Sequence, residues 1–315
     1  MVRFFHEEEQ MTRSIAFAAA VVAILMAAVP AFAGISGPVL VSGPSPFASC
    51  TVGGPGTNYP NAEVEPWVAV NPADSTNVVG VFQQDRWSNG GAHGLVTGVS
   101  HDGGTSWSET WAHLSTCAGG TATNGGGYDR SSDPWVTFAP NGTAYQISIS
   151  ISADEITSAV LVSRSTNGGD NWGEPITLIR DDTPFNFNDK ESITADPTNA
   201  SYAYAVWDRA RKPGENADFN ALHSFAFRGD VLVSRTTNGG TSWEPARRAL
   251  PTNANLFTIG NRIAVRPKPR HPHTIIRALD PGHDVVKLSR LPPAHPRCVL
   301  APLSYSYVDF ACPHR

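Results

Sequence analysis

The sequence lacks a surplus of charge of either sign. Only 16% of its 315 residues are charged, and the formal net charge is −5. A nucleic-acid-binding protein normally carries a basic surface. The composition therefore gives no reason to expect a nucleic-acid partner.

The sequence also lacks a long membrane span, because the apolar run Ile15–Val29 is short for a bilayer. Arg13 precedes this run, and Ala-Phe-Ala ends it at Ala33, which is the pattern of a secretory signal peptide. A membrane anchor is the alternative. We expect residues 1–33 to be removed, with Met11 as an alternative start, and the mature protein to be secreted without a stable membrane anchor.

Cysteine is scarce. The four cysteines are Cys50, Cys117, Cys298 and Cys312, and nothing around them has the spacing of zinc ligands. No EF-hand spacing is present, so we expect no metal and no cofactor, with Ca²⁺ on acidic loops as the alternative. In an oxidising compartment Cys50 and Cys117 can pair and tie the N-terminal segment to the first repeat, whereas free thiols are the alternative.

Glycine, proline and tryptophan are plentiful, with 28, 25 and 8 residues. This composition favours many short strands joined by tight turns. Three similar motifs follow β-rich stretches: SHDGGTSW (Ser100–Trp107), STNGGDNW (Ser165–Trp172) and TTNGGTSW (Thr236–Trp243). Their recurrence calls for a common structural cause.

Each motif belongs to a repeated unit of four predicted strands. Strands A and B are separated by a turn around Pro72, Pro140 or Pro197, strand C precedes the motif and strand D follows it. A fourth unit begins at Gly260–Pro267. One such sheet cannot bury both faces alone, but radially stacked sheets bury them against each other. We predict an all-β fold, a β-propeller of four-stranded antiparallel blades over residues 63–267, after an N-terminal segment that follows the signal peptide. A β-sandwich is the alternative that the internal period disfavours.

The motif is predicted to form the turn between strands C and D. Its Asp or Asn side chain can accept hydrogen bonds from backbone N–H groups of the turn. Its second glycine supplies a positive φ, and its tryptophan packs into the blade. These residues are therefore predicted to be structural: Ser100, Asp102, Gly104, Trp107, Ser165, Asn167, Gly169, Trp172, Thr236, Asn238, Gly240 and Trp243.

The units resemble Asp-box (BNR) repeats, of the form Ser/Thr-x-Asp-x-Gly-x-x-Trp. The first motif matches fully, and the other two carry Asn in place of Asp. Such repeats typify sialidase-like β-propellers, which include exo-α-sialidases, other glycosidases and non-catalytic proteins. The resemblance implies a six-bladed ancestry, here truncated to three to four blades, and a glycan or glycoconjugate as partner. Catalytic sialidases have three arginines for the sialic acid carboxylate, a Tyr/Glu nucleophile pair, an Asp acid/base and an Arg-Ile-Pro motif. That motif is absent, since Arg262 and Ile263 are not followed by proline.

The meander topology predicts where a site lies. The C–D turns of all blades share one rim, while the starts of A and the ends of B share the other, around a central opening. The alternative is that charged residues at this second rim are solvated or form structural ion pairs. The charged residues placed there are Glu65, Asp85, Arg86, Asp129, Arg130, Asp133, Asp154, Glu155, Asp189, Lys190, Glu191, Asp208 and Arg209.

Three arginines of this set can bind a substrate carboxylate through forked hydrogen bonds: Arg86, Arg130 and Arg209. Four further charged residues are predicted to bind substrate beside them. These are Asp85, Asp189, Lys190 and Asp208.

The predicted catalytic residues are carboxylates and one tyrosine. Glu191 or Asp133 can act as acid/base if burial or a like-charged neighbour raises the pKa. Tyr128 is a candidate nucleophile, with aromatic packing under a Gly-rich loop as the alternative. His93 and His113 are expected at loop and strand surfaces rather than as ligands.

After Pro267 the sequence is rich in Pro, His and Arg and has no evident strand–turn–strand plan. We expect an irregular tail over residues 268–315. It either comes from a shifted reading frame or is genuine, in which case the protein is an open fragment or assembles with another copy. Two functions remain. One is a secreted, sialidase-like exo-glycosidase, and the other is a non-catalytic glycan- or protein-binding propeller or an inactive truncated remnant.

Overall fold

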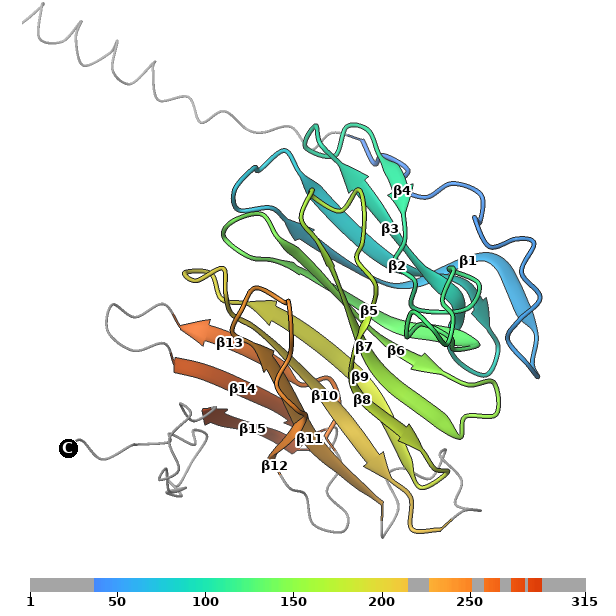
Figure 1. Ribbon diagram of the computed structural model, residues 1–315, viewed down its shortest axis with the longest axis vertical. Coiled ribbons are helices and arrows are strands. Elements are labelled where there is room, and N and C mark those ends of the chain that lie inside the picture. The colour runs from blue at the N-terminus through green and yellow to red at the C-terminus, as the bar shows by residue number, and fades with distance from the viewer. Residues whose placement is uncertain (1–36, 215–226, 251–257, 267–272, 281–282, 291–315) are drawn as a thin grey trace, which may run out of the picture. The chain divides into compact units, whose positions relative to one another are not determined.

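The computed structural model describes residues 37–214, 227–250, 258–266, 273–280 and 283–290, the last two ranges by their backbone. Every regular element in these ranges is a β-strand (Figure 1). A search of the same ranges for a helix long and apolar enough to cross a membrane finds none. The predicted signal peptide lies outside the described residues.

The strands pair antiparallel with their neighbours in chain order, as the four predicted units require. One bridge, Ala92 to Ser131, links the sheets of the first two units. We call the units blades 1 to 4. Blade 1 contains β1 (Asn58–Val70), β2 (Val78–Trp87), β3 (Ala92–Ser100) and β4 (Ser108–Thr110), and blade 2 contains β5 (Arg130–Phe138), β6 (Ala144–Ile151), β7 (Thr157–Ser165) and β8 (Ile176–Asp182). Blade 3 contains β9 (Asn186–Ala195), β10 (Ala203–Arg211), β11 (Arg228–Thr236) and β12 (Arg247–Leu250). The described part of blade 4 contains β13 (Arg262–Arg266), β14 (His273–Asp280) and β15 (His283–Arg290).

The first strand of each blade, which we call its inner strand, contacts the inner strand of the next blade. β1 packs against β5, β5 against β9, and β9 against β13 (Figure 1). Sheets that share an axis through their first strands form a β-propeller. The predicted all-β propeller of four-stranded blades is thus confirmed, and the blades in the described part of the chain form an open arc.

The three tryptophan motifs form the predicted turns between third and fourth strands. In the first turn, Asp102 Oδ1 accepts hydrogen bonds from the backbone N–H of Ser106 at 2.9 Å and of Thr105 at 3.0 Å. Gly104 has a φ of 90°, and its N–H donates to Ser100 Oγ at 2.8 Å. The other turns repeat this pattern with Asn167 accepting from Asn171 N, Asn238 from Ser242 N, Ser165 from Gly169 N and Thr236 from Gly240 N.

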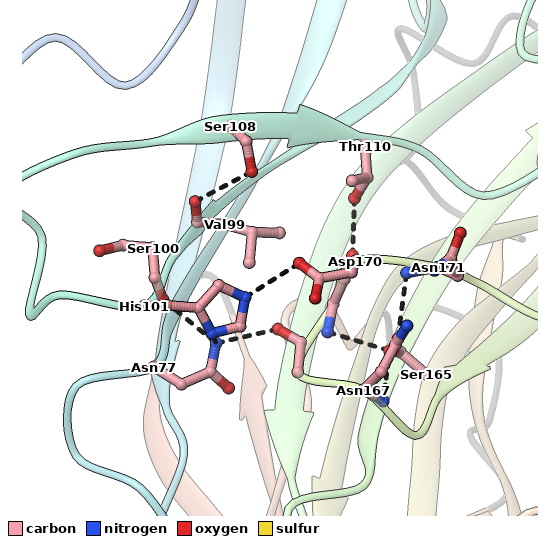
Figure 2. A network of polar contacts seen from close by, with 12 residues as sticks. Asn77, Val99, Ser100, His101, Ser108, Thr110, Ser165, Asn167, Asp170 and Asn171 are labelled. Atoms are coloured by element: carbon pink, nitrogen blue, oxygen red, sulfur yellow. Dashed lines mark hydrogen bonds and ion pairs between the residues drawn. The ribbon is translucent and has the colours of Figure 1, made fainter.

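These turns also join neighbouring blades (Figure 2). Asn77 Nδ2 donates to a backbone carbonyl of the second turn at 3.0 Å, and Thr110 Oγ1 donates to Gly169 O at 2.7 Å. His101 Nε2 lies 2.9 Å from Asp170 Oδ1. Polar groups on this rim therefore serve the contact between blades 1 and 2.

The tryptophans of the second and third turns pack between blades. Trp172 contacts apolar clusters that include Val99 of blade 1 and Val136 of blade 2. Trp243 meets Tyr145 of the preceding blade edge-on, with ring centroids 6.3 Å apart. Each therefore stabilises the stacking of two sheets as well as its own turn.

Residues 39–52 cover the face of blade 1 that points away from blade 2. Phe47 lies against Gly94 of β3, where a larger side chain would leave no room. The predicted disulfide between Cys50 and Cys117 is formed. The N-terminal segment is thereby fixed on a sheet face that would otherwise lack a neighbour.

This covered face corrects the prediction for His93, which was expected on a loop surface. His93 lies in β3, is buried, and places Nδ1 3.2 Å from Asp85 Oδ2. Its ring meets Trp87 edge-on, and its partner Asp85 also binds Ser45 of the N-terminal segment, which is distant in sequence. His113 lies at the surface, 3.0 Å from Glu174.

The expectation of an irregular tail after Pro267 is wrong for part of that region. The backbone forms β14 and β15, which pair with β13 as the second and third strands of blade 4. The β-branched pairs Thr274-Ile275 and Val285-Val286 carry the signal that the Pro- and His-rich composition hid. Cys298 and Cys312 lie outside the described residues.

Candidate functional site

A cleft of about 250 Å³ is lined by the inner strands β1, β5 and β9 and by the start of β13 with the two residues before it. Each blade contributes three consecutive residues at the equivalent position of its inner strand. The lining residues are Glu65, Pro66, Trp67, Asp133, Pro134, Trp135, Lys190, Glu191, Ser192, Gly260, Asn261 and Arg262.

A local irregularity of the inner strands brings these side chains together. Strand pairing skips two residues within β1, β5 and β9, which creates a bulge in each. The first cleft residue of each blade has positive φ: 53° at Glu65, 51° at Asp133, 45° at Lys190 and 70° at Gly260. Three of these are not glycine, so the conformation costs about 1–3 kcal/mol at each. Backbone strain of this kind tends to cluster at functional sites, and here it recurs at the equivalent position of three blades.

An ionic group occupies one side of the cleft. Lys190 Nζ lies 2.8 Å from Glu65 Oε1 and 3.2 Å from Asp133 Oδ2. Gln83 Nε2 donates to the other Glu65 oxygen at 2.7 Å. A hydrogen bond with Asp133, together with burial, raises the pKa of Glu65. The single ammonium group of Lys190 is therefore shared by two carboxylates.

Glu191 is the unusual carboxyl group of the cleft. It is 4% exposed, and neither of its oxygens has a hydrogen-bond partner among the described residues. Burial, and secondarily the nearby charge of Asp133, raises its pKa well above the ordinary value. The protonated form is thus favoured, and a buried neutral carboxyl group can donate a proton.

Strand β10 of blade 3 adds a second buried carboxyl group, Asp208, behind the cleft. Asp208 accepts hydrogen bonds from Asn261 Nδ2, from Thr258 Oγ1 and, at 3.0 Å, from the N–H of Gly260. Burial raises the pKa of Asp208 well above its ordinary range. Asp208 therefore supports the cleft from behind, rather than lining it.

Two tryptophans give the cleft an aromatic wall. Trp67 and Trp135 stack with ring centroids 3.4 Å apart. The guanidinium of Arg262 lies over both rings, 5.3 Å and 4.9 Å from their centroids. These residues were not among the predicted site residues. The repeat nevertheless indicates a shared position for the two tryptophans, since Trp follows Glu-Pro and Asp-Pro at matching positions of two units.

Of the predicted catalytic residues, Glu191 and Asp133 line the cleft and Tyr128 does not. Tyr128 is buried in an apolar cluster with Leu95 and Leu114, and Arg180 Nη1 donates to its hydroxyl at 3.2 Å. Its placement matches aromatic packing under the Gly-rich loop. The nucleophile hypothesis for Tyr128 is therefore not supported by its position.

The three predicted carboxylate-binding arginines do not line the cleft. Arg130 is fully buried and donates to the carbonyls of Gly53, Pro55 and Gly90 at 2.6–2.8 Å. Its donors hold the N-terminal loop, so it is a structural residue. The loop comes from a distant part of the sequence, which is why the position of Arg130 was mispredicted.

Arg86 and Arg209 are likewise engaged elsewhere. Arg86 Nη1 donates to Gln83 Oε1 at 3.1 Å and so supports the residue that binds Glu65. Arg209 forms a bidentate pair with Asp181. These two arginines, near the ends of the second strands β2 and β10, thus lie outside the cleft that the inner strands line.

The other charged residues that were predicted to bind substrate divide in the same way. Lys190 lines the cleft, whereas Asp85 accepts hydrogen bonds from Ser45 and Asn61 and anchors the N-terminal segment. Asp189 lies beside the cleft, where burial raises its pKa. The remaining rim residues bind local backbone, with Asp129 accepting from Ala153 N and Asp154 from Ile156 N, and Glu155 occupies the same outer loop.

The described residues contain no group of three or more His, Cys, Asp or Glu side chains placed to hold a metal ion. Ca²⁺ on the acidic loops stays an untested alternative.

Comparison with known proteins places the fold. No family model matches the chain, and no curated protein matches it. Among solved structures, the Hadza microbial sialidase Hz136 is similar with a TM-score of 0.51 and 14% identity, over 73% of this chain and 44% of that one. A GH93 α-L-arabinofuranosidase of Fusarium graminearum, solved with arabinobiose, gives 0.46 and 13%, over 75% of this chain and 63% of that one. The α-L-arabinanase of Penicillium chrysogenum gives 0.45 and 14%, over 76% and 64%.

The likeness to the sialidase defines the class of fold. This chain has a sialidase-like β-propeller fold, and it spans less than half the length of that sialidase. At 14% identity the likeness concerns the fold alone.

Proposed function

We propose that this chain is a carbohydrate-active protein of the glycoside hydrolase type, which binds the end of a glycan in the inner-strand cleft. The observation that carries the proposal is Glu191, a residue of the cleft lining whose buried carboxyl group has no partner among the described residues, beside a second carboxylate of the same lining, Asp133. Glycoside hydrolysis uses one protonated and one ionised carboxyl group. The aromatic wall of Trp67 and Trp135 offers an apolar surface for a sugar ring.

The proposed reaction uses two residues of the cleft lining and one water molecule. Glu191 donates its proton to the glycosidic oxygen as the bond from that oxygen to the anomeric carbon breaks. A water molecule forms the new bond to the anomeric carbon and gives its proton to Asp133. The products are a free sugar and an alcohol, and proton exchange with solvent restores both carboxyl groups.

A non-catalytic glycan-binding propeller is the second candidate. It is favoured by the ion pair between Lys190 and Asp133, which occupies the carboxylate that a water-activating base would need. The displacement of Arg86, Arg130 and Arg209 from the cleft also argues against a sialidase-type carboxylate clamp.

A panel of aryl glycosides and a fluorogenic sialoside separates the candidates. We expect turnover by the natural sequence, and a loss of at least about 100-fold in Glu191→Gln because the proton donor is removed. Asp154→Asn is the matched control, since Asp154 is an exposed carboxylate outside the cleft. Glycan binding without turnover supports the second candidate, and the absence of both contradicts the proposal.

Secretion is part of the proposal. The leader pattern of residues 1–33 and the disulfide Cys50–Cys117 both fit an oxidising compartment. N-terminal sequencing of protein recovered from the culture medium should begin after Ala33. A mature protein retained with its leader would contradict this part.

A further inference from the structure

On blade 4 the cleft lining includes Asn261, whose side-chain amide is held by a hydrogen bond to Asp208. Asn261 is 1% exposed, and its Nδ2 donates to Asp208, which is itself fully buried. Asn261 Oδ1 has no hydrogen-bond partner among the described residues. Asp208 therefore determines which end of the amide is free, and the free end is a hydrogen-bond acceptor.

Asn261 and Glu191 occupy the same position of neighbouring inner strands. Their strands are joined there, because Ser192 Oγ donates to Asn261 O at 2.8 Å. Both residues belong to the cleft lining, and the side chains of both contain buried oxygens without a partner among the described residues. A protonated carboxyl group offers one donor and an acceptor, and the amide oxygen adds a further acceptor.

The charges around this wall disfavour an anionic ligand. Lys190, one of the two cations that line the cleft, is already shared between Glu65 and Asp133. The other cation, Arg262, lies over the aromatic rings. A ligand carboxylate placed against Asn261 Oδ1 would face acceptor oxygens and the charge of Asp133.

We infer that Asn261, positioned by Asp208, is a specificity-determining residue that recognises sugar hydroxyl groups together with Glu191, so that the cleft takes an uncharged sugar. The inference rests on the proposed function and specifies its substrate class. Hydroxyl groups both donate and accept, which matches the unpaired groups of this wall, whereas a carboxylate only accepts.

The first test needs no variant. Uncharged aryl pentosides and hexosides should be turned over with at least about tenfold higher kcat/KM than aryl glucuronides and sialosides, since a mismatched buried polar group weakens binding of the transition state. Equal or higher kcat/KM for the carboxylate-bearing substrates would overturn the inference. If no substrate is turned over, the same comparison is made on the dissociation constants of the corresponding free sugars.

Variants then test the positioning role. Asn261→Leu and Asp208→Asn should raise KM for the best uncharged substrate about tenfold while kcat changes less, because a binding contact is lost and the proton donor stays. Thr194→Val is the matched control. It removes an equivalent hydrogen bond between blades 3 and 4, from Thr194 Oγ1 to Ile263 O, outside the cleft.

The outcomes distinguish the two proposals. Unchanged KM in folded Asn261→Leu protein, or an equal change in Thr194→Val, overturns the inference and leaves the proposed function standing. Neither turnover nor binding of any sugar by the natural sequence overturns the proposed function, and the inference falls with it.

Discussion

The two rims of the propeller use the same residue types for opposite purposes. On the rim of the tryptophan turns, Asp102 is exposed, and its bonds to Ser106, to the turn backbone and to Ser100 lower its pKa to about 2. On the cleft rim, Glu191 is buried without a partner and its pKa is raised. A carboxylate that is fully bonded stabilises its turn, whereas a carboxyl group left unbonded is available to a ligand.

The backbone shows the same contrast. Positive φ on the turn rim falls on glycines such as Gly104, Gly169 and Gly240, where it costs little. On the cleft rim it falls on Glu65, Asp133 and Lys190. Three strained residues and the unpartnered oxygens of Glu191 and Asn261 thus lie in the lining of one cleft, which we interpret as the functional rim.

The largest effect is expected at Arg130, which begins the inner strand β5 but donates hydrogen bonds to backbone carbonyls outside the cleft. Arg130→Met should lower the free energy of unfolding by about 4 kcal/mol, since several buried carbonyl groups lose their donor. Urea denaturation measures this loss. The kcat/KM of the folded variant should be unchanged, and a raised KM at unchanged stability would restore a substrate-binding role for Arg130.

The disulfide should have the next largest effect. Replacing Cys50 and Cys117 by serine should lower the free energy of unfolding by about 2–4 kcal/mol, because the unfolded chain gains freedom over a long loop. Urea denaturation with and without a reducing agent checks this. The reductant should destabilise the natural sequence and leave the double variant unaffected; equal stability of the two proteins would refute the role of the N-terminal segment.

The pH dependence of stability sharpens the contrast between carboxyl groups. Burial raises the pKa of Glu191, so the folded protein keeps a proton that the unfolded chain releases. The contribution of Glu191 to the free energy of unfolding is complete below the ordinary glutamate pKa. It declines as pH rises towards the raised pKa, by up to about 1.4 kcal/mol per pH unit.

Glu191→Gln should flatten that decline, as measured by thermal unfolding between pH 4 and 9. Asp208 contributes in the same direction because its pKa is also raised. An identical slope in the natural sequence and in Glu191→Gln would show that Glu191 ionises normally.

The smallest effect is expected at the turn rim. Asp102→Ala should lower Tm because the turn loses its acceptor, whereas Asp102→Asn should behave almost like the natural sequence, since the other two turns already use Asn. The stabilising contribution of Asp102 should be present at neutral pH and disappear as pH falls towards about 2. A Tm for Asp102→Asn as low as that for Asp102→Ala would contradict the equivalence of the turns.

The parts of the molecule that depend on local pattern were predictable from the sequence. The strand order, the tryptophan turns and the convergence of Glu65, Asp133, Lys190 and Glu191 all follow from one repeated unit. The repeat also contained the positions of Trp67 and Arg262, which a full alignment of the units places beside the acidic residues.

The parts that depend on distant segments were not predictable. Arg130, Asp85 and His93 have charges or rings typical of a site, yet they bind or lie beneath the N-terminal segment. The disulfide between Cys50 and Cys117 was predicted, but the face that the segment covers also depends on its fit to Gly94, which the local pattern does not show.

A crystal structure of the Glu191→Gln protein, soaked with the best sugar from the glycoside panel, tests the central claim most directly. The account predicts the sugar ring in the inner-strand cleft, with a hydroxyl group on Asn261 Oδ1 and the glycosidic oxygen beside residue 191. A sugar bound on the rim of the tryptophan turns, or an empty cleft at saturating sugar, would contradict it.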